Sequence, residues 1–296
     1  MERPLVKHGG STLMISLPKK WLDKQKLSKG DKIHIIDYSD KLVLSVKERE
    51  KDFLETTVHF KKADYEQVRA VLGTLHRKGY KKIFVKYEDP KTIYFIQLIT
   101  KAIFGFEIIK QEENGCIIKN IIEELSIDAD EILNKVINII KTEFIIVREY
   151  LEKGIKGKDN EIRTIRDDCW KFRNITYINL KETLLASAFD QYFLIHMVEY
   201  NSSFLYWLYR SFDNSDIKKV DKDLIKIYDL ITDYFNQSIS KMKKKDKEYI
   251  DYIMINREKL LKECEAYSSG NNEDRFLAIY LGMLVQNIHN PKSLIV

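Results

Sequence analysis

Residues Lys7–Trp21 read KHGGSTLMISLPKKW, and Leu27–Ile36, a few residues on, read LSKGDKIHII. The Gly-Gly-Ser-Thr run predicts a hairpin turn, because it lacks the Lys-Ser/Thr ending of a phosphate-binding loop and opens no helix. A short strand over Leu13–Leu17 follows. A helix over about Pro18–Lys26 comes next, since proline in a first helical turn loses no hydrogen bond. With a last hairpin around Ser39-Asp40, the first 50 residues read as strand, strand, helix, strand, strand.

These residues resemble the AbrB/SpoVT/MazE family of small swapped-hairpin DNA-binding domains, in the form found at the front of archaeal PhoU-type phosphate-uptake regulators. The resemblance implies a domain over residues 1–50 that forms an obligate homodimer and binds double-stranded DNA. It implies a DNA-facing surface lined by Arg3, Lys7, Lys19, Lys20 and Lys24. Ser11 and Thr12 of the turn are further candidates for contact with a DNA phosphate.

The positive charge of the chain is concentrated in the same segment. Residues 1–30 hold seven basic and two acidic residues, which equals the net charge of +5 of the whole chain. A local basic patch attracts a polyanion and releases counterions on contact. Lysine binds phosphate as a point charge, so only Arg3 suits bidentate base reading. Two alternatives stay open: a solvated lysine-rich face, and a head that only dimerises the protein.

Composition bounds the class of protein. A chain of 296 residues with 44% hydrophobic and 32% charged residues is long enough for two or three globular domains. Its three cysteines are far apart, which disfavours a disulfide framework or a thiolate zinc site and suits a reducing cytoplasm. We expect no membrane span and no signal peptide. No spacing of residues indicates a catalytic arrangement, so an enzyme is not expected.

The remainder predicts two further parts and an α+β multidomain fold. Residues 55–120 read as a small α/β domain, with Asn114-Gly115 as a hairpin signal between two strands. This domain is either a rigid or dimerising spacer or the site of a regulatory-ligand pocket. Residues 123–290 contain no proline and read as six helices with short connections. By resemblance, they form a PhoU-like body of two three-helix bundles in tandem.

The helical part offers weak candidates for metal binding. PhoU proteins repeat a Glu/Asp-x-x-x-Asp motif, and Glu199 occupies one acidic position here, but Ile195 stands where the partner carboxylate belongs. Glu161 is a second candidate on another helix. A divalent or iron-type metal is therefore possible on a degraded motif, and no cofactor is certain. His196 is either a ligand or pH switch, or a packed residue with one satisfied nitrogen.

An aromatic run on the same helix permits base stacking, but its spacing favours packing in a bundle core or an interface. The run consists of Phe204, Tyr206, Trp207, Tyr209 and Phe212.

The resemblance as a whole implies a transcriptional regulator of phosphate uptake and phosphate homeostasis, in which a DNA-binding head is coupled to a sensor body. An alternative is a cytoplasmic adaptor that contacts phosphate-transporter subunits and binds no DNA. A third reading, an antitoxin-like partner, follows from the MazE kinship, and the long helical body argues against it.

Overall fold

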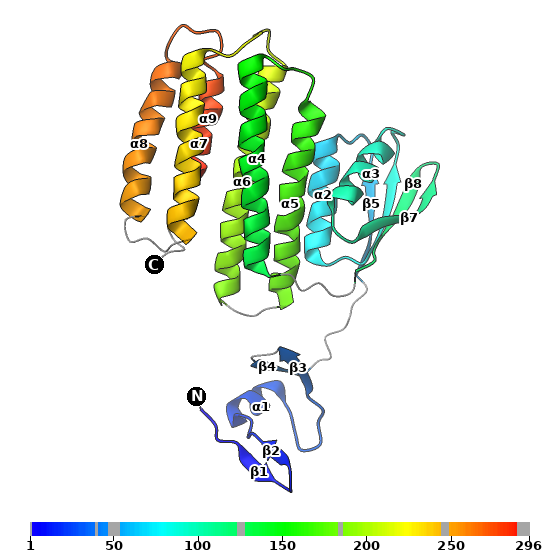
Figure 1. Ribbon diagram of the computed structural model, residues 1–296. Helices are drawn as coiled ribbons and strands as arrows, with labels where there is room; N and C mark the ends of the chain where they lie inside the picture. The colour runs from blue at the N-terminus through cyan, green and yellow to red at the C-terminus, as the bar shows by residue number, and fades with distance from the viewer. Residues whose placement is uncertain are drawn as a thin grey trace. The chain divides into compact units, whose positions relative to one another are not determined.

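The computed structural model describes residues 2–38, 41–46, 54–122, 128–182, 186–243 and 249–288. The chain forms two compact units, Met1–Phe53 and Leu54–Val296. Small antiparallel sheets dominate the first unit, and the second combines a four-stranded sheet with a helical body (Figure 1). The α+β class and the helical C-terminal part are thus confirmed.

The first unit begins with the expected hairpin. Strand β1 (Val6–His8) pairs antiparallel with β2 (Thr12–Met14), and Gly9 takes a positive φ of 74° in the turn between them. The second strand starts earlier and ends earlier than the predicted Leu13–Leu17. Helix α1 (Lys19–Gln25) follows, with Pro18 as its N-cap.

A second hairpin completes this unit. Strand β3 (His34–Tyr38) pairs antiparallel with β4 (Lys41–Ser45), and the predicted turn at Ser39-Asp40 lies outside the described residues. None of residues 2–35 and 42–46 is buried. Ile35 and Leu42 on these strands are each 63% exposed. These residues therefore form no hydrophobic core of their own.

The sheet of the second unit has the strand order β5-β6-β8-β7, in which β5 and β6 are parallel and the other neighbours are antiparallel. Its elements are β5 (Glu55–Phe60), α2 (Tyr65–Lys78), β6 (Lys82–Tyr87), α3 (Thr92–Ala102), β7 (Phe106–Glu112) and β8 (Gly115–Asn120). Local signals set the helix ends: Asp64 and Gln67 form a capping box at the start of α2, and Gly79 ends it at a φ of 88°.

The hairpin between β7 and β8 confirms the prediction with a shift of one residue. Glu112 pairs with Gly115, so the two turn residues are Glu113 and Asn114. Gly115 is instead the first residue of β8, where a Cβ would lie 2.7 Å from the carbonyl oxygen of Val85. The glycine is needed for the close approach of two strands, not for the turn.

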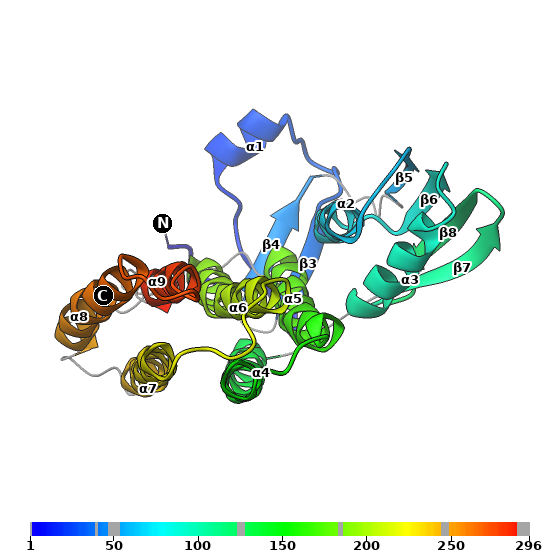
Figure 2. The same ribbon diagram turned by 90° about the horizontal axis from the view of Figure 1, so that it is seen from above.

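Six helices form the body, within the described ranges. They are α4 (Ala129–Lys153), α5 (Asp159–Glu182), α6 (Ala186–Asp213), α7 (Lys222–Lys243), α8 (Tyr249–Ser268) and α9 (Leu277–Ile288). Figure 2 shows α8, α9, α6 and α5 in one row and α7 and α4 in a second row. A single hydrophobic core joins both rows. Within the described ranges, no helix combines the length and the apolarity needed to cross a bilayer.

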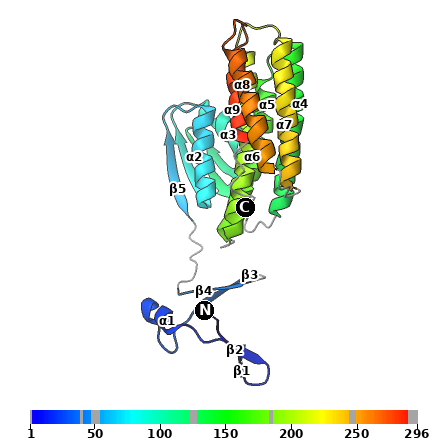
Figure 3. The same cartoon turned by 90° about the vertical axis from the view of Figure 1, so that its left-hand side faces the viewer.

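The ranges 55–120 and 123–290, separate domains in the sequence prediction, pack here within one compact unit. Helix α2 lies between β5 and the helices of the body (Figure 3) and packs against α5. Trp170 of α5 belongs to the hydrophobic core of the sheet, and Gly73 of α2 leaves room for its indole. The indole thus joins the two parts.

Candidate functional site

All seven residues predicted to contact DNA are exposed and lie in the first unit. Arg3 precedes β1 and Lys7 lies in β1. Ser11 ends the hairpin turn, and Thr12 is the first residue of β2. The remaining three residues, Lys19, Lys20 and Lys24, lie on α1.

The lysines of α1 are presented by an amphipathic arrangement. Trp21 and Leu22 of the same helix are half-buried, as predicted, which leaves the lysines on the solvent side. Lys20 and Lys24 are one helical turn apart, a spacing that suits neighbouring phosphates. Within the described part of the chain, none of the five predicted basic residues forms a salt bridge. Their charge is therefore available to an external polyanion.

The weak metal candidates are not brought together. Glu161 accepts a hydrogen bond of 2.7 Å from the hydroxyl of Tyr150 and is exposed. Glu199 is buried on α6 and accepts a hydrogen bond of 2.9 Å from Nη1 of Arg173. No group of three His, Cys, Asp or Glu side chains suited to a metal ion occurs among the described residues.

Glu199 instead forms a salt bridge with Arg173, and His196 lies beside this pair. The same Nη1 of Arg173 lies 3.2 Å from Nδ1 of His196. Burial acts to raise the pKa of Glu199, but Arg173 and then His196 outweigh it, so this pKa lies below its usual value. One ring nitrogen of His196 thus has a partner, as expected for a packed histidine.

A second ionic cluster joins α2 to α5. Nη2 of the buried Arg166 lies 2.8 Å from Oε1 of Glu66, and Nε of Arg69 lies 3.2 Å from Oδ1 of Asp167. The hydroxyl of Tyr65 donates to the other oxygen of Asp167. Buried charges are expensive unless they are paired, so the pair of Arg166 with Glu66 makes the relative position of the two helices specific. Burial raises the pKa of Asp167 to about 8, which weakens its charge pairing with Arg69 near neutral pH.

The buried carboxylate of Glu143 on α4 lacks such a partner. Neither of its oxygens accepts a hydrogen bond of normal geometry from the described residues. Burial raises the pKa of Glu143 well above its usual value, although the hydroxyl of Ser202 and the guanidinium of Arg166 favour the charged form. Burial thus favours the neutral form of Glu143 over the charged form.

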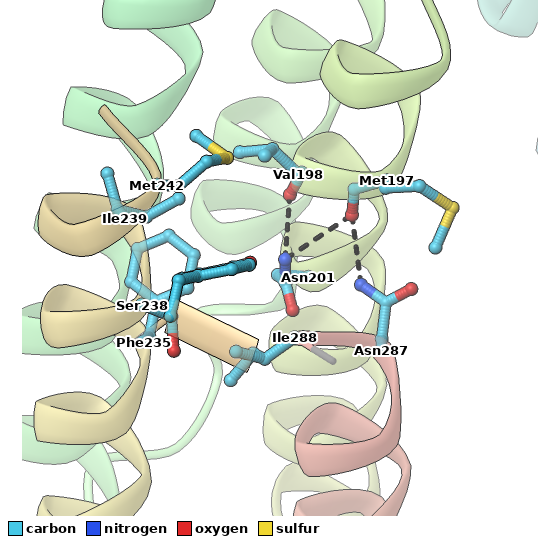
Figure 4. Close-up of a pocket in the computed structure, with 10 residues that line it drawn as sticks. Met197, Val198, Asn201, Phe235, Ser238, Ile239, Met242, Asn287 and Ile288 are labelled. Atoms are coloured by element: carbon cyan, nitrogen blue, oxygen red, sulfur yellow. Dashed lines mark hydrogen bonds between the residues drawn. The ribbon is translucent and has the colours of Figure 1, made fainter. Parts of the chain in front are cut away.

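A small cavity lies where α6, α7, α8 and α9 meet. Its volume is about 10 Å³, comparable with the space for a single water molecule. Asn201 and Asn287 both donate to the carbonyl oxygen of Met197 beside it (Figure 4). The cavity is too small for an organic effector or a phosphate ion.

The sequence indicated only part of these features. The aromatic run packs as favoured, since Tyr206, Tyr209 and Phe212 are buried in the core. Neither ionic cluster was expected. The signal for them was a set of arginines on α5 in phase with its apolar face, namely Arg163, Arg166 and Arg173.

The stretches from which the sequence predicts a family, Lys7–Trp21 and Leu27–Ile36, form the first hairpin, α1 and the start of β3 in the first unit. The resemblance of the rest of the chain rests on the order of its parts. No protein-family model, curated protein or solved structure matches the chain.

Proposed function

We propose that the chain is a dimeric, DNA-binding transcriptional regulator of phosphate uptake that acts in the cytoplasm. The DNA-binding role is supported by two features of the first unit. Its predicted contact residues are exposed without acidic partners among the described residues, and none of residues 2–35 and 42–46 is buried. Such a unit needs a second copy to fold stably, and the resulting dimer offers a basic surface.

In this proposal each chemical group has a separate role. The lysines of α1 contact phosphates and set affinity, while Ser11 and Thr12 add hydrogen bonds to the backbone. Arg3 is the one residue of the set whose planar guanidinium can read a guanine edge in two hydrogen bonds. We therefore expect strong dependence on salt and modest dependence on base sequence.

The DNA-binding part is tested by fluorescence anisotropy with duplex promoter fragments over a range of salt concentrations. The triple variant Lys19→Ala/Lys20→Ala/Lys24→Ala should bind at least about tenfold more weakly, and its salt slope should fall by about 0.9 for each phosphate that the protein no longer neutralises. The matched control removes three exposed lysines of the second unit, Lys222, Lys259 and Lys262. Equal affinity of the wild type and the α1 variant would contradict the proposal.

The phosphate-related part follows from the family resemblance and needs its own test. Chromatin immunoprecipitation under phosphate-rich and phosphate-starved conditions should show enrichment at transporter operons that differs between the two conditions. DNA binding in vitro without any such difference would retain the DNA-binding role and reject phosphate as the signal.

A further inference from the structure

Four aromatic rings form a continuous ladder along one side of α6. Tyr192, His196, Tyr200 and Phe204 follow one another at intervals of four residues, with successive ring centroids 5.9, 5.4 and 5.7 Å apart. Trp207 stands on the next turn. We call these five residues the aromatic stripe. It spans about 22 Å along the helix, at a rise of about 1.5 Å per residue.

The aromatic stripe is partly open to solvent although α6 packs against α4, α5 and α9. Tyr200 is 43% exposed and Trp207 is 38% exposed, while the other three members are half-buried. Tyr and Trp are enriched in the energetically important centres of protein interfaces, because they bury a large area at a low cost in side-chain entropy. A row of such rings on one helix has the character of a docking surface.

Two positively charged side chains lie near the aromatic stripe among the residues that the structure describes. Arg210 lies over the ring of Trp207 at 5.1 Å and donates a hydrogen bond to the hydroxyl of Tyr206. Arg77 of α2 donates to Asn174 and Thr74. Neither guanidinium has a salt bridge within the described part of the chain.

Arg77 is close to the other end of the aromatic stripe. Burial and the neighbouring Arg173 lower the pKa of Arg77, and the hydroxyl groups of Tyr192 and Tyr177 act in the opposite sense. Glu199, the carboxylate of α6 within the range of the stripe, is buried and paired with Arg173. Counting only residues that the structure describes, the stripe has a cation without a carboxylate partner near each end.

We propose that the aromatic stripe of α6 docks an amphipathic helix of a partner protein, whose apolar side chains lie on the rings and whose acidic side chains face Arg77 and Arg210. The neighbouring helix α9 contains no charged residue and exposes Ile279 and Met283. Such an apolar surface with two spare cations suits an acidic helix better than a polyanion. This inference does not depend on the DNA-binding function of the first unit.

The test uses the full chain and two synthetic helical peptides of about 18 residues, or about 27 Å. Both peptides carry leucines at helical spacing, flanked by glutamates in one and by lysines in the other. We expect the wild type to bind the glutamate peptide at least about tenfold more tightly, measured by calorimetry. The variant Tyr200→Ser/Trp207→Ser should lose this binding, whereas Ile145→Ser/Leu230→Ser, which alters exposed apolar residues of α4 and α7, should retain it.

A second experiment reverses the charge of the two arginines. The variant Arg77→Glu/Arg210→Glu should reverse the preference in favour of the lysine peptide, provided that its circular dichroism melting curve shows a folded protein. Failure of the glutamate peptide to bind, equal binding of both peptides, or binding that the stripe variant retains would each overturn the proposal. The proposal would also be overturned if the wild type bound a single-stranded oligothymidylate, or associated with itself, and the stripe variant did not. Nucleic acid or a second copy of the chain would then be the occupant of the aromatic stripe.

Discussion

Glu143 shows how a single residue couples this fold to pH. Its carboxyl group is fully buried near Ser202, Arg166, Cys169 and Tyr228, and burial raises its pKa well above the usual value. The folded state therefore keeps a proton that the unfolded state releases above about pH 4.3. Stability from this group is fully present below that pH and is lost as the pH rises toward the folded pKa.

Replacement of Glu143 by Gln removes this titration and keeps the shape of the side chain. We expect E143Q to be at least as stable as the wild type at pH 7, with an advantage that grows by up to about 1.4 kcal/mol per pH unit until the folded pKa. Urea unfolding between pH 5 and pH 9 measures it. Burial raises the pKa of Asp167 to about 8. Asp167 titrates in both proteins, so its contribution cancels in the stability difference between them.

The control for this series is Glu131→Gln, an exposed position on the same helix. Its stability difference from the wild type should not change with pH. If E143Q were instead less stable by more than about 1 kcal/mol at pH 8, Glu143 would be charged and held by Arg166, contrary to the interpretation above.

At the scale of the elements, the contact between α2 and α5 connects the sheet to the helical body within the second unit; we call this contact the joint. It combines the ion pair of Arg166 with Glu66 and the contact of Arg69 with Asp167 with the insertion of Trp170 into the core of the sheet. The guanidinium of Arg69 also lies 4.5 Å from the centre of the Trp170 ring. The joint therefore depends on the close approach that Gly73 allows.

Gly73→Ala tests this joint. A Cβ at this position would overlap the indole of Trp170, so we expect a loss of about 1–3 kcal/mol in the free energy of unfolding, despite the better helix propensity of alanine. Gly282→Ala in α9 is the matched control, because its Cβ would make only an ordinary contact of 3.8 Å with Cβ of Cys264. That variant should gain up to about 1 kcal/mol in urea unfolding. Equal effects of the two substitutions would show that helix propensity alone determines the change in stability.

Across the molecule as a whole, the two compact units differ in how they are stabilised. The second unit has two hydrophobic clusters, whereas the first exposes several apolar strand residues, among them Leu13 at 60% and Ile35 at 63%. Exposed apolar strands of a small unit are stabilised when another chain covers them. We therefore expect assembly to depend on the first unit.

Ile35→Glu places a charge on such a strand. It should convert dimers to monomers in multi-angle light scattering and weaken duplex binding by at least about tenfold, because burying an unpaired charge costs several kcal/mol. Ile145→Glu, at an isoleucine of α4 that is 66% exposed, should leave both properties unchanged. A wild type that is monomeric at all concentrations would reject the dimer.

The order and type of the elements follow from the amino-acid sequence, because their signals are local. Asp64, Gln67 and Gly79 set the ends of α2 from within one segment, and apolar spacing predicted the six helices of the body. Only the packed fold brings Arg166 to Glu66, 100 residues away, and inserts Trp170 into the core of the sheet. Capping and periodicity act between neighbours in the chain, whereas ion pairing and burial arise only when distant elements pack together.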